Sequence, residues 1–475
     1  MKSEITKTKI LATLGPATNT LKKIQSLINE GLDGVRLNFS HGSHEDHKYF
    51  FDLIDQVCRK NSIPLSVLQD LQGPKIRVGK LESEQVELED GSEIELTSAD
   101  IKGNAAKIPI LYNRLENEAE VGNKILIDDG LISLLVVDKK KDAVIAQVIE
   151  GGIVKPHKGV NFPGMKLSVP SLTEKDFRDL DFGFGFHTDF IALSFVRTPD
   201  DIYKLREYLN EKNQKKKIIA KIEKKEAVNN FDEIMKIADG IMIARGDLGV
   251  EMEPHKVPPI QKSIIRECNA VGKLVITATQ MLESMIQNPV PTRAEASDVA
   301  NAVWDGTDVV MLSGETAVGS YPVETVRVMN NIILTTEEKK DLRYSTNYTI
   351  PDDLNDNLFD SVGRAVTRIS QQIEASMIVV FTHYGRKARI ISKFRPDAPI
   401  VAISNKFETM NYLSLIWGIK SFFMNEFDNE NKAIEKATKI LKENSLVKSG
   451  DVVLFTAGSP YGEKGRESWV RFVVF

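Results

Sequence analysis

The sequence predicts an α/β protein: a parallel (β/α)8 barrel, or TIM barrel, with an all-β lid domain inserted after its third strand and an α/β domain at its C-terminus. Short apolar runs alternate with amphipathic stretches up to about residue 73 and again from residue 174. That alternation stops in between, where short strands follow one another. A polar segment at 337–353 then separates a further set of strands and helices.

Eight apolar runs are the predicted barrel strands, three before the insert and five after it, which is the number that a (β/α)8 barrel requires. They are KILATLG (9–15), GVRLNF (34–39), PLSVLQD (64–70), DFIALSF (189–195), KKIIAKIE (216–223), GIMIA (240–244), KLVITAT (273–279) and DVVMLS (308–313). Amphipathic stretches follow these runs, from 21–29 and 45–60 to a last helix at 323–335, and AVNNFDEIMKIA is expected to be one of the helices.

The insert is rich in Val, Ile and Leu and is broken by turn signals such as Asp129-Gly130, with no helix expected. The predicted domains are 1–73 and 168–340 for the barrel, 74–167 for the lid and 341–475 for the C-terminal domain. Five strands are expected in the last domain: MIVVFT, PIVAIS, IKSFFM, DVVLFT and WVRFVVF. Because the last strand ends at Phe475, no further C-terminal module is expected.

Composition narrows the classes of function. The 475 residues are 42% hydrophobic and 27% charged, as in ordinary globular proteins. A net charge of −5 does not indicate the basic surface of a nucleic-acid-binding protein. The N-terminus lacks the apolar run of a signal peptide, and no run is long enough to cross a membrane. Cys58 and Cys268 have neither the spacing of a disulfide framework nor that of a metal site, which fits a reducing cytosol. Together these observations predict a cytoplasmic protein without nucleic-acid or membrane partners.

Charged residues end two neighbouring predicted strands. Lys221 and Glu223 close one strand, and Asp247 follows the next. The carboxyl ends of parallel strands form the active face of such a barrel, so these groups should meet there. Two carboxylates suit Mg²⁺, which takes its other ligands from water and substrate oxygens. The alternative is that Lys221 and Glu223 cap a strand and that Asp247 turns a loop.

Motifs along the whole barrel resemble those of the pyruvate kinase family. No single motif is decisive, but together they touch nearly every strand end in the family's order. They are ATLGPAT (12–18), GVRLNFSHG (34–42), LQDLQGPKIR (68–77), KIE (221–223), ARGDLGVE (244–251), TATQMLESM (277–285), PTRAEASDVANAV (291–303) and MLSGETA (311–317).

The resemblance implies a phosphotransferase that moves the phosphoryl group of phosphoenolpyruvate to ADP, giving pyruvate and ATP in the final step of glycolysis. It implies Mg²⁺ or Mn²⁺ held by Glu223 and Asp247, with Lys221 neutralising charge on the phosphoryl group and the enolate. Such a reaction depends on positioning and charge neutralisation, which fits these residues. The family resemblance also implies a homotetramer.

The resemblance assigns further substrate contacts to Arg36, Arg77, Gly246 and Thr279. Arg36 and Arg77 each follow a predicted strand, and a guanidinium grips phosphate with two parallel hydrogen bonds. Gly246 would let backbone N–H groups approach the substrate carboxylate. Thr279 would lie near the enolate carbon that is protonated, with water as a relay; its alternative role is to cap a helix over QMLESM.

Two more sets of residues match family positions. The nucleotide contacts would be Arg36, Asn38, His41, Arg77 and Lys158. The family's monovalent-cation position corresponds to Asn38, Ser40, Asp70 and Leu71, and Lys75 stands where K⁺-dependent relatives carry glutamate. Because that change reverses a charge, the resemblance to the K⁺-independent branch implies that K⁺ is not required, with Lys75 in its place. The alternative is that Lys75 is solvated on the hinge into the lid.

Other interpretations remain open at this point. His41, His44 and His47 could suggest zinc, although no cysteine or fourth ligand accompanies them. DFGFGF at 181–186 lacks the other protein-kinase motifs. Within enzymes, a mutase or aldolase acting on phosphoenolpyruvate or pyruvate is possible, but the inserted lid argues for a second, nucleotide substrate. A non-catalytic sugar-phosphate sensor is disfavoured by the complete set of reactive residues.

A loop in the last domain departs from the family pattern. Relatives carry T-x-S-G-x-[ST] around a sugar phosphate, whereas this chain has Thr382-His383-Tyr384-Gly385-Arg386-Lys387. Two hydroxyl positions are lost, and Arg386 and Lys387 could attract phosphate only as cations. Weak or absent activation by fructose 1,6-bisphosphate is therefore expected.

Overall fold

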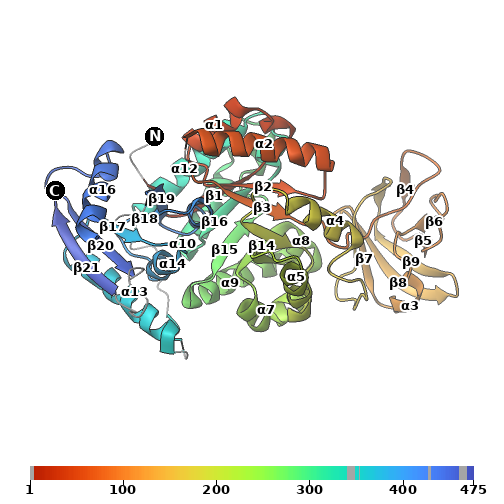
Figure 1. Ribbon diagram of the computed structural model, residues 1–475. Coiled ribbons are helices and arrows are strands. Elements are labelled where there is room, and N and C mark those ends of the chain that lie inside the picture. Colours follow the sequence, from red (N-terminus) through yellow and green to blue (C-terminus); the bar gives the residue numbers. More distant parts are fainter. Residues whose placement is uncertain (1–4, 62, 340–347, 352–353, 426–428, 459–467) are drawn as a thin grey trace.

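The computed structural model describes residues 5–61, 63–339, 348–351, 354–425, 429–458 and 468–475. A barrel lies in the middle, a lid extends from one side and a C-terminal domain packs against the other (Figure 1). Most of the segment predicted as a linker, 337–353, lies outside the described residues. None of the described helices is both long and apolar enough to cross a bilayer.

The barrel is closed and parallel, which confirms the predicted fold class. Its strand order is β1-β16-β15-β14-β13-β12-β3-β2. Each barrel strand therefore pairs with the next barrel strand along the chain, and β1 pairs with β16 to close the ring. The strands are β1 (Lys9–Thr13), β2 (Gly34–Asn38), β3 (Ser66–Asp70), β12 (Phe190–Leu193), β13 (Lys217–Ile222), β14 (Gly240–Ala244), β15 (Leu274–Ala278) and β16 (Val309–Leu312).

Helices surround this barrel and pack their apolar faces on it. Their starts follow local chemistry: Thr20, Thr173 and Thr292 each accept a backbone N–H at a helix N-terminus. The helices are η1 (Pro16–Thr18), α1 (Leu21–Asn29), α2 (His44–Asn61), α4 (Glu174–Gly183), α5 (Pro199–Glu211), α6 (Lys225–Asn229), α7 (Phe231–Ile237), α8 (Arg245–Glu251), η2 (Pro254–Lys256), α9 (Val257–Val271), η3 (Glu283–Ile286), α10 (Arg293–Asp305), α11 (Gly314–Ala317) and α12 (Pro322–Glu337).

The prediction of one helix over AVNNFDEIMKIA is wrong, because the chain breaks there into α6 and α7. The break lies at Asn230, whose backbone leaves the helical region (φ −102°, ψ 18°). Its side-chain amide donates to the carbonyl of Arg197, 2.9 Å away. That hydrogen bond gives Asn230 a partner outside the helix.

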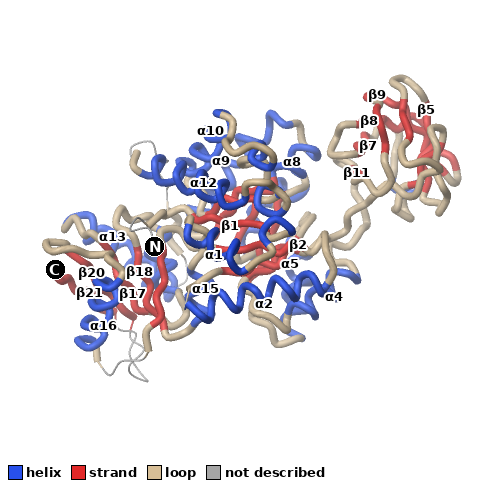
Figure 2. The backbone as a smooth tube through the Cα atoms, turned by 90° about the horizontal axis from the view of Figure 1, so that it is seen from above, coloured by secondary structure: helices blue, strands red, loops and turns tan. Residues whose placement is uncertain are grey.

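The lid is a β structure on two extended connections (Figure 2). Six strands form a sheet in the order β11-β7-β8-β9-β5-β6, and β4 pairs with β10. The prediction of no helix is wrong in one place, the single turn α3 (Leu115–Glu118). The strands are β4 (Val86–Leu88), β5 (Glu93–Thr97), β6 (Lys107–Pro109), β7 (Lys124–Ile127), β8 (Ile132–Lys140), β9 (Ala143–Glu150), β10 (Gly152–Val154) and β11 (Val160–Asn161).

The C-terminal domain is a five-stranded sheet in the order β19-β18-β17-β20-β21, covered by helices. Its Arg395 pairs with the barrel's Asp308 at 2.6 Å, which ties the two domains together at the end of the barrel far from the lid. The elements are α13 (Leu354–Gln372), β17 (Met377–Phe381), α14 (Arg386–Lys393), β18 (Ile400–Ser404), α15 (Phe407–Leu413), β19 (Ile419–Phe423), α16 (Glu430–Glu443), β20 (Val452–Gly458) and β21 (Ser468–Val474).

Candidate active site

A chain of buried charges crosses the carboxyl ends of the barrel strands. Lys221 Nζ lies 2.8 Å from Glu223 Oε1 and 3.3 Å from Asp70 Oδ1. It also donates to Ser194 Oγ at 2.8 Å. Because β3, β12 and β13 are adjacent parallel strands, residues far apart in the sequence meet at this edge.

Arg36 completes this chain of charges from β2. Its Nε donates to Asp70 Oδ2 at 2.7 Å, and its Nη1 donates to Thr13 Oγ1 at 3.1 Å. The expectation that Arg36 follows a strand is wrong, since it lies within β2 and is buried. A barrel strand can point a long side chain inward and along its axis, so the guanidinium still reaches the carboxyl end.

The mutual pairing keeps these groups charged despite burial. Burial opposes the charged form of Lys221, but Asp70 and Glu223 outweigh it and raise the pKa of the amine above its ordinary value. Burial likewise opposes ionisation of Asp70, yet Lys221 and Arg36 hold its pKa below the usual range. Lys221 is therefore a fixed ammonium at neutral pH.

Glu223 is a buried carboxylate whose ionisation is disfavoured. Burial raises its pKa, and the charge of Asp247 raises it further, while Lys221 and a hydrogen bond from the Phe195 backbone act in the other direction. That N–H lies 2.7 Å from Glu223 Oε2. Two carboxylates that repel each other in a buried site favour a bound divalent cation.

The donor set fits an ion that shares its coordination with substrate. Across the described ranges, no group of three or more His, Cys, Asp or Glu side chains is placed to hold a metal by itself. Glu223 and Asp247 would thus supply two oxygens, and Asp247 lines the cleft between barrel and lid. This open arrangement matches the preference of Mg²⁺ for few protein ligands.

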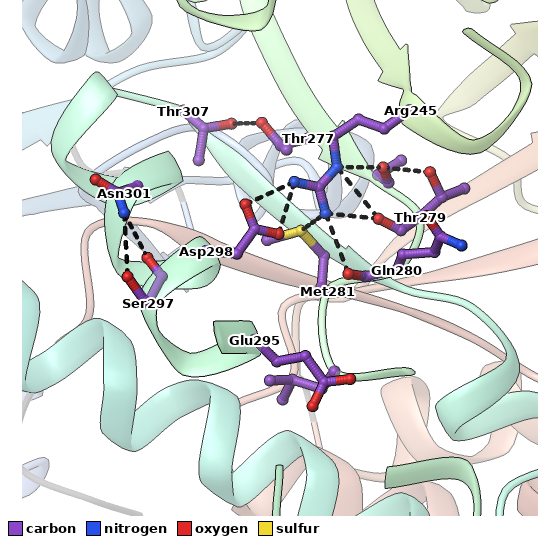
Figure 3. Close-up of polar contacts among 12 residues, drawn as sticks. Arg245, Thr277, Thr279, Gln280, Met281, Glu295, Ser297, Asp298, Asn301 and Thr307 are labelled. Carbon is purple, nitrogen blue, oxygen red and sulfur yellow. Dashed lines mark hydrogen bonds and ion pairs between the residues drawn. The ribbon is translucent and has the colours of Figure 1, made fainter. Parts of the chain in front are cut away.

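A strained turn after β15 carries Thr279 (Figure 3). Thr279 and Gln280 both have left-handed backbones, with φ of 67° and 54°. Arg245 holds this turn: its guanidinium donates to the carbonyl of Thr279 at 2.6 Å and pairs with Asp298 at 2.7 Å. Such backbone strain persists only when neighbours fix it, and functional sites often hold it.

The hydroxyl of Thr279 faces Gly246 and does not cap a following helix. Gly246 N–H donates to Thr279 Oγ1 at 2.8 Å, and that hydroxyl donates to the carbonyl of Ala278 at 2.6 Å. The capping interpretation is wrong, because only the 3-10 turn η3 follows, beginning at Glu283. The start of α8 and the end of β15 are therefore joined at this point.

The end of β2 and the loop after it carry Asn38, Ser40 and His41. Asn38 Oδ1 accepts the backbone N–H of Ser40 at 3.2 Å. His41 is exposed, and burial of part of its ring together with the charges of Lys75, Arg77 and Arg36 lowers its pKa. Leu71 is buried, and its carbonyl accepts from Ser194 Oγ at 2.7 Å.

The three histidines do not converge on a metal. His44 Nε2 lies 2.8 Å from Asp179 Oδ1. His47 Nε2 lies 3.0 Å from the carbonyl of His41, and its ring stacks on Phe39 at 3.9 Å. These contacts give the rings of His44 and His47 partners of their own, and no group of three or more metal-ligating side chains converges around them in the described part of the chain.

Arg77 and Lys158 both lie where the chain enters and leaves the lid. Arg77 pairs with Gly159 as an isolated bridge, and its Nη1 donates to the carbonyl of His157 at 2.8 Å. Lys158 Nζ lies 2.8 Å from Asp128 of the lid. The structure thus groups these two cations at the connections between barrel and lid, apart from the ion pairs of Lys221.

Sequence reasoning missed three residues that position the site: Thr13, Ser194 and Arg245. Thr13 and Ser194 bind the charged side chains directly from the ends of β1 and β12. Both are hydroxyl residues at predicted strand ends, which is the signal that could have found them. Arg245 binds backbone carbonyls at the end of the neighbouring strand β15, and such carbonyl partners leave no trace in side-chain patterns.

Comparisons with known proteins agree with this geometry. The family description "Pyruvate kinase, barrel domain" matches residues 5–326, and "Pyruvate kinase, alpha/beta domain" matches residues 360–473. The pyruvate kinases of Staphylococcus aureus strains MRSA252 and USA300 are each 42% identical over 469 residues, covering 98% of this chain and 80% of the relative. A crystal structure of a pyruvate kinase from Cryptosporidium parvum superposes with a TM-score of 0.91 at 36% identity, covering 99% of this chain and 96% of that one. The chain therefore belongs to the pyruvate kinase family.

Proposed function

We propose that the protein transfers the phosphoryl group of phosphoenolpyruvate to ADP, with pyruvate and ATP as products. The observation that carries this proposal is the buried chain of charges from Arg36 through Asp70 and Lys221 to Glu223. Phosphoryl transfer needs fixed cations beside the transferred group and little covalent chemistry from the protein. Preformed charges in a buried site stabilise developing charge without reorganisation.

Glu223 and Asp247 would hold Mg²⁺, or Mn²⁺ in its place. When bound, the ion supplies positive charge to the substrate's carboxylate and phosphate oxygens. Lys221 would then neutralise charge on the transferring phosphoryl group and on the enolate oxygen that it leaves. Arg36, already oriented by Asp70 and Thr13, would grip phosphate with the N–H groups that remain.

Thr279 and Gly246 would act on the other side of the substrate. The hydroxyl of Thr279 is held between the Gly246 N–H and the Ala278 carbonyl, which fixes its position. A hydroxyl is a poor acid by itself, so we propose that it orients a water that delivers the proton to the enolate carbon. Gly246 keeps the backbone free of a Cβ at this point.

The nucleotide would bind between the barrel and the lid, against Arg36, Asn38, His41, Arg77 and Lys158. The lowered pKa of His41, caused by burial and the cations near it, marks a positive region that suits polyphosphate. We propose further that K⁺ is not required, because both oxygens of Asp70 already accept from Arg36 and Lys221. A cytoplasmic homotetramer is the proposed state of the protein.

A coupled assay of pyruvate formation tests the reaction. We expect pyruvate to form only with ADP and Mg²⁺ present. A mutase or aldolase would be indifferent to ADP, and a sugar-phosphate sensor would not turn over. Glu223→Gln and Asp247→Asn should each lower kcat about a thousandfold or more with the fold retained by circular dichroism, since a metal ligand is lost. Near wild-type activity in either variant at low Mg²⁺ would reject the metal assignment.

A further inference from the structure

Glu251 is a buried carboxylate that the reaction chemistry does not use. It lies on α8 one helical turn after Asp247, and its side chain is 1% exposed. Residues four apart on a helix share a face, so Asp247 and Glu251 point toward the same side. A buried carboxylate without partners is costly, so its partners show why it is retained.

Those partners come from two different parts of the molecule. Lys224 Nζ binds Glu251 Oε1 as an ion pair, and Lys224 directly follows Glu223 in the chain. Asn161 Nδ2 donates to the same oxygen at 3.0 Å, and Asn161 belongs to the lid strand β11. Glu251 thus joins the lid to the helix and the strand end that carry the proposed metal ligands.

The surroundings of Glu251 are also a place where lid and barrel meet. Asn161, Lys224 and Asp247 line one cleft between the two domains. A Cβ added at Gly130 of the lid would lie 4.0 Å from Val250 Cγ1, beside Glu251 on α8. The lid therefore meets the end of α8 at Asn161 and approaches it at Gly130.

We infer that Glu251 is a positioning residue: it couples the position of the lid to the metal site by binding Asn161 of the lid and by holding Lys224 away from Glu223 and Asp247. The inference rests on the proposed function for its place in catalysis. When the lid swings out, Glu251 loses the Asn161 hydrogen bond. When Glu251 is neutralised, the Lys224 ammonium loses its partner and becomes free to compete with a divalent cation for the carboxylates in the cleft.

Three single variants separate these two contacts from general effects. Asn161→Ala removes the lid contact and leaves the ion pair. Glu251→Gln removes the counter-charge of Lys224 and keeps an acceptor for Asn161. Glu226→Gln is the matched control, because Glu226 lines the same cleft and loses the same unit of charge without touching the lid residue.

Lid position is measured as the distance distribution between spin labels on the full-length chain. Lys139 on the lid and Lys204 on α5 are exposed, so Lys139→Cys and Lys204→Cys provide the labels. Cys58→Ser removes the half-buried native thiol, whereas Cys268 is buried. We expect Asn161→Ala to broaden the distribution toward longer distances and to lower kcat/KM about three- to tenfold, the net value of one typical hydrogen bond. Asn104→Ala is the lid control, since Asn104 bonds Glu82 within the lid.

Metal affinity is measured with Mn²⁺ alone, from the electron paramagnetic resonance signal of the free ion. We expect the Mn²⁺ dissociation constant to rise about tenfold in Glu251→Gln and to change less than about twofold in Glu226→Gln. An equal rise in both variants would reduce the effect to net charge and overturn the inference. An unchanged distance distribution in Asn161→Ala would also overturn the inference. This measurement tests the lid contact even if Glu251→Gln fails to fold. The distance distribution and the Mn²⁺ dissociation constant are measured without turnover, so a failure of the proposed reaction in the unmodified chain is distinguished from a failure of the coupling.

Discussion

Two buried lysines in two domains illustrate opposite ways of placing an amine near the end of a strand. Lys221 of the barrel lies between Asp70 and Glu223, whose charges outweigh burial and raise its pKa. Lys387 of the C-terminal domain follows β17 on α14, and its Nζ donates to the carbonyl of Ala457 at 2.5 Å. Burial lowers its pKa to about 8. Carboxylates, not burial, therefore decide whether a buried lysine keeps a fixed charge.

The largest expected effect concerns the fixed charge of the barrel. Lys221→Met should lower kcat for phosphoryl transfer about a thousandfold or more, because the ammonium acts on charge that develops in the transition state. Exchange of the methyl protons of pyruvate, which needs the enolate but no P–O cleavage, should be affected much less. The two rates are measured by the coupled assay and by proton NMR in D₂O. An equal loss of both activities would contradict the placement of Lys221 beside the phosphoryl group.

The C-terminal lysine should affect stability instead. Unfolded, Lys387 titrates near 10.5, whereas in the folded chain its pKa is about 8. Between these values the unfolded chain binds a proton that the folded chain does not, so the free energy of unfolding of the wild type rises with pH across this window. Lys387→Met lacks this titration. The difference in unfolding free energy between wild type and variant should therefore shift by up to about 3 kcal/mol in favour of the wild type.

Urea unfolding of both proteins at pH 7 and at pH 10 measures this shift, and the pairwise comparison cancels the titration of the other groups. A difference that stays constant with pH would mean that Lys387 titrates normally. The pKa values of Lys387 and Lys221 would then differ less than the surroundings of the two amines indicate.

The barrel and its reactive end could be predicted from sequence because both depend on local patterns. Apolar runs give the strands, and parallel strands bring their carboxyl ends together, so Lys221, Glu223 and Asp247 were predicted to meet. The ion pair of Lys221 with Asp70 was not predicted. The break at Asn230 and the inward course of Arg36 were not predicted either, because each depends on a partner that another segment supplies. The contrast between Lys221 and Lys387 was equally hidden, since burial and distance to a carboxylate are properties of the folded chain.

A third lysine tests the comparison at the surface. Lys75 is exposed where the chain enters the lid, so solvent screens its charge. Burial is the main cause of the lowered pKa of His41, and the charge of Lys75 is the next largest cause. We expect activity without K⁺, Na⁺ or NH₄⁺ to lie within about twofold of activity with KCl at the same ionic strength. Lys75→Glu reverses the charge and should create a dependence on K⁺ of about tenfold, less than an unscreened charge would give. Tetramethylammonium chloride keeps ionic strength constant, and a strong K⁺ requirement of the unmodified enzyme would reject the proposal.

The smallest expected effect is that of fructose 1,6-bisphosphate on the loop around Lys387. The groups there that could hold a phosphate are already engaged. Gly385 N–H donates to Thr382 Oγ1 at 3.0 Å, and Arg386 pairs with Asp356 and lies 4.1 Å from the ring of Phe359. Lys387 turns inward to Ala457, and Tyr384 of the same loop is 77% exposed.

We therefore expect the ligand to change the apparent KM for phosphoenolpyruvate by less than about twofold, which is a coupling free energy of less than about 0.4 kcal/mol. A large fall in KM would show that the loop rearranges to free these groups. Stability gives an independent check, because an anion bound within reach of Lys387 would hold its ammonium charged in the folded chain. Saturating ligand would then abolish the pH-dependent difference between wild type and Lys387→Met, whereas an unoccupied loop leaves that difference unchanged.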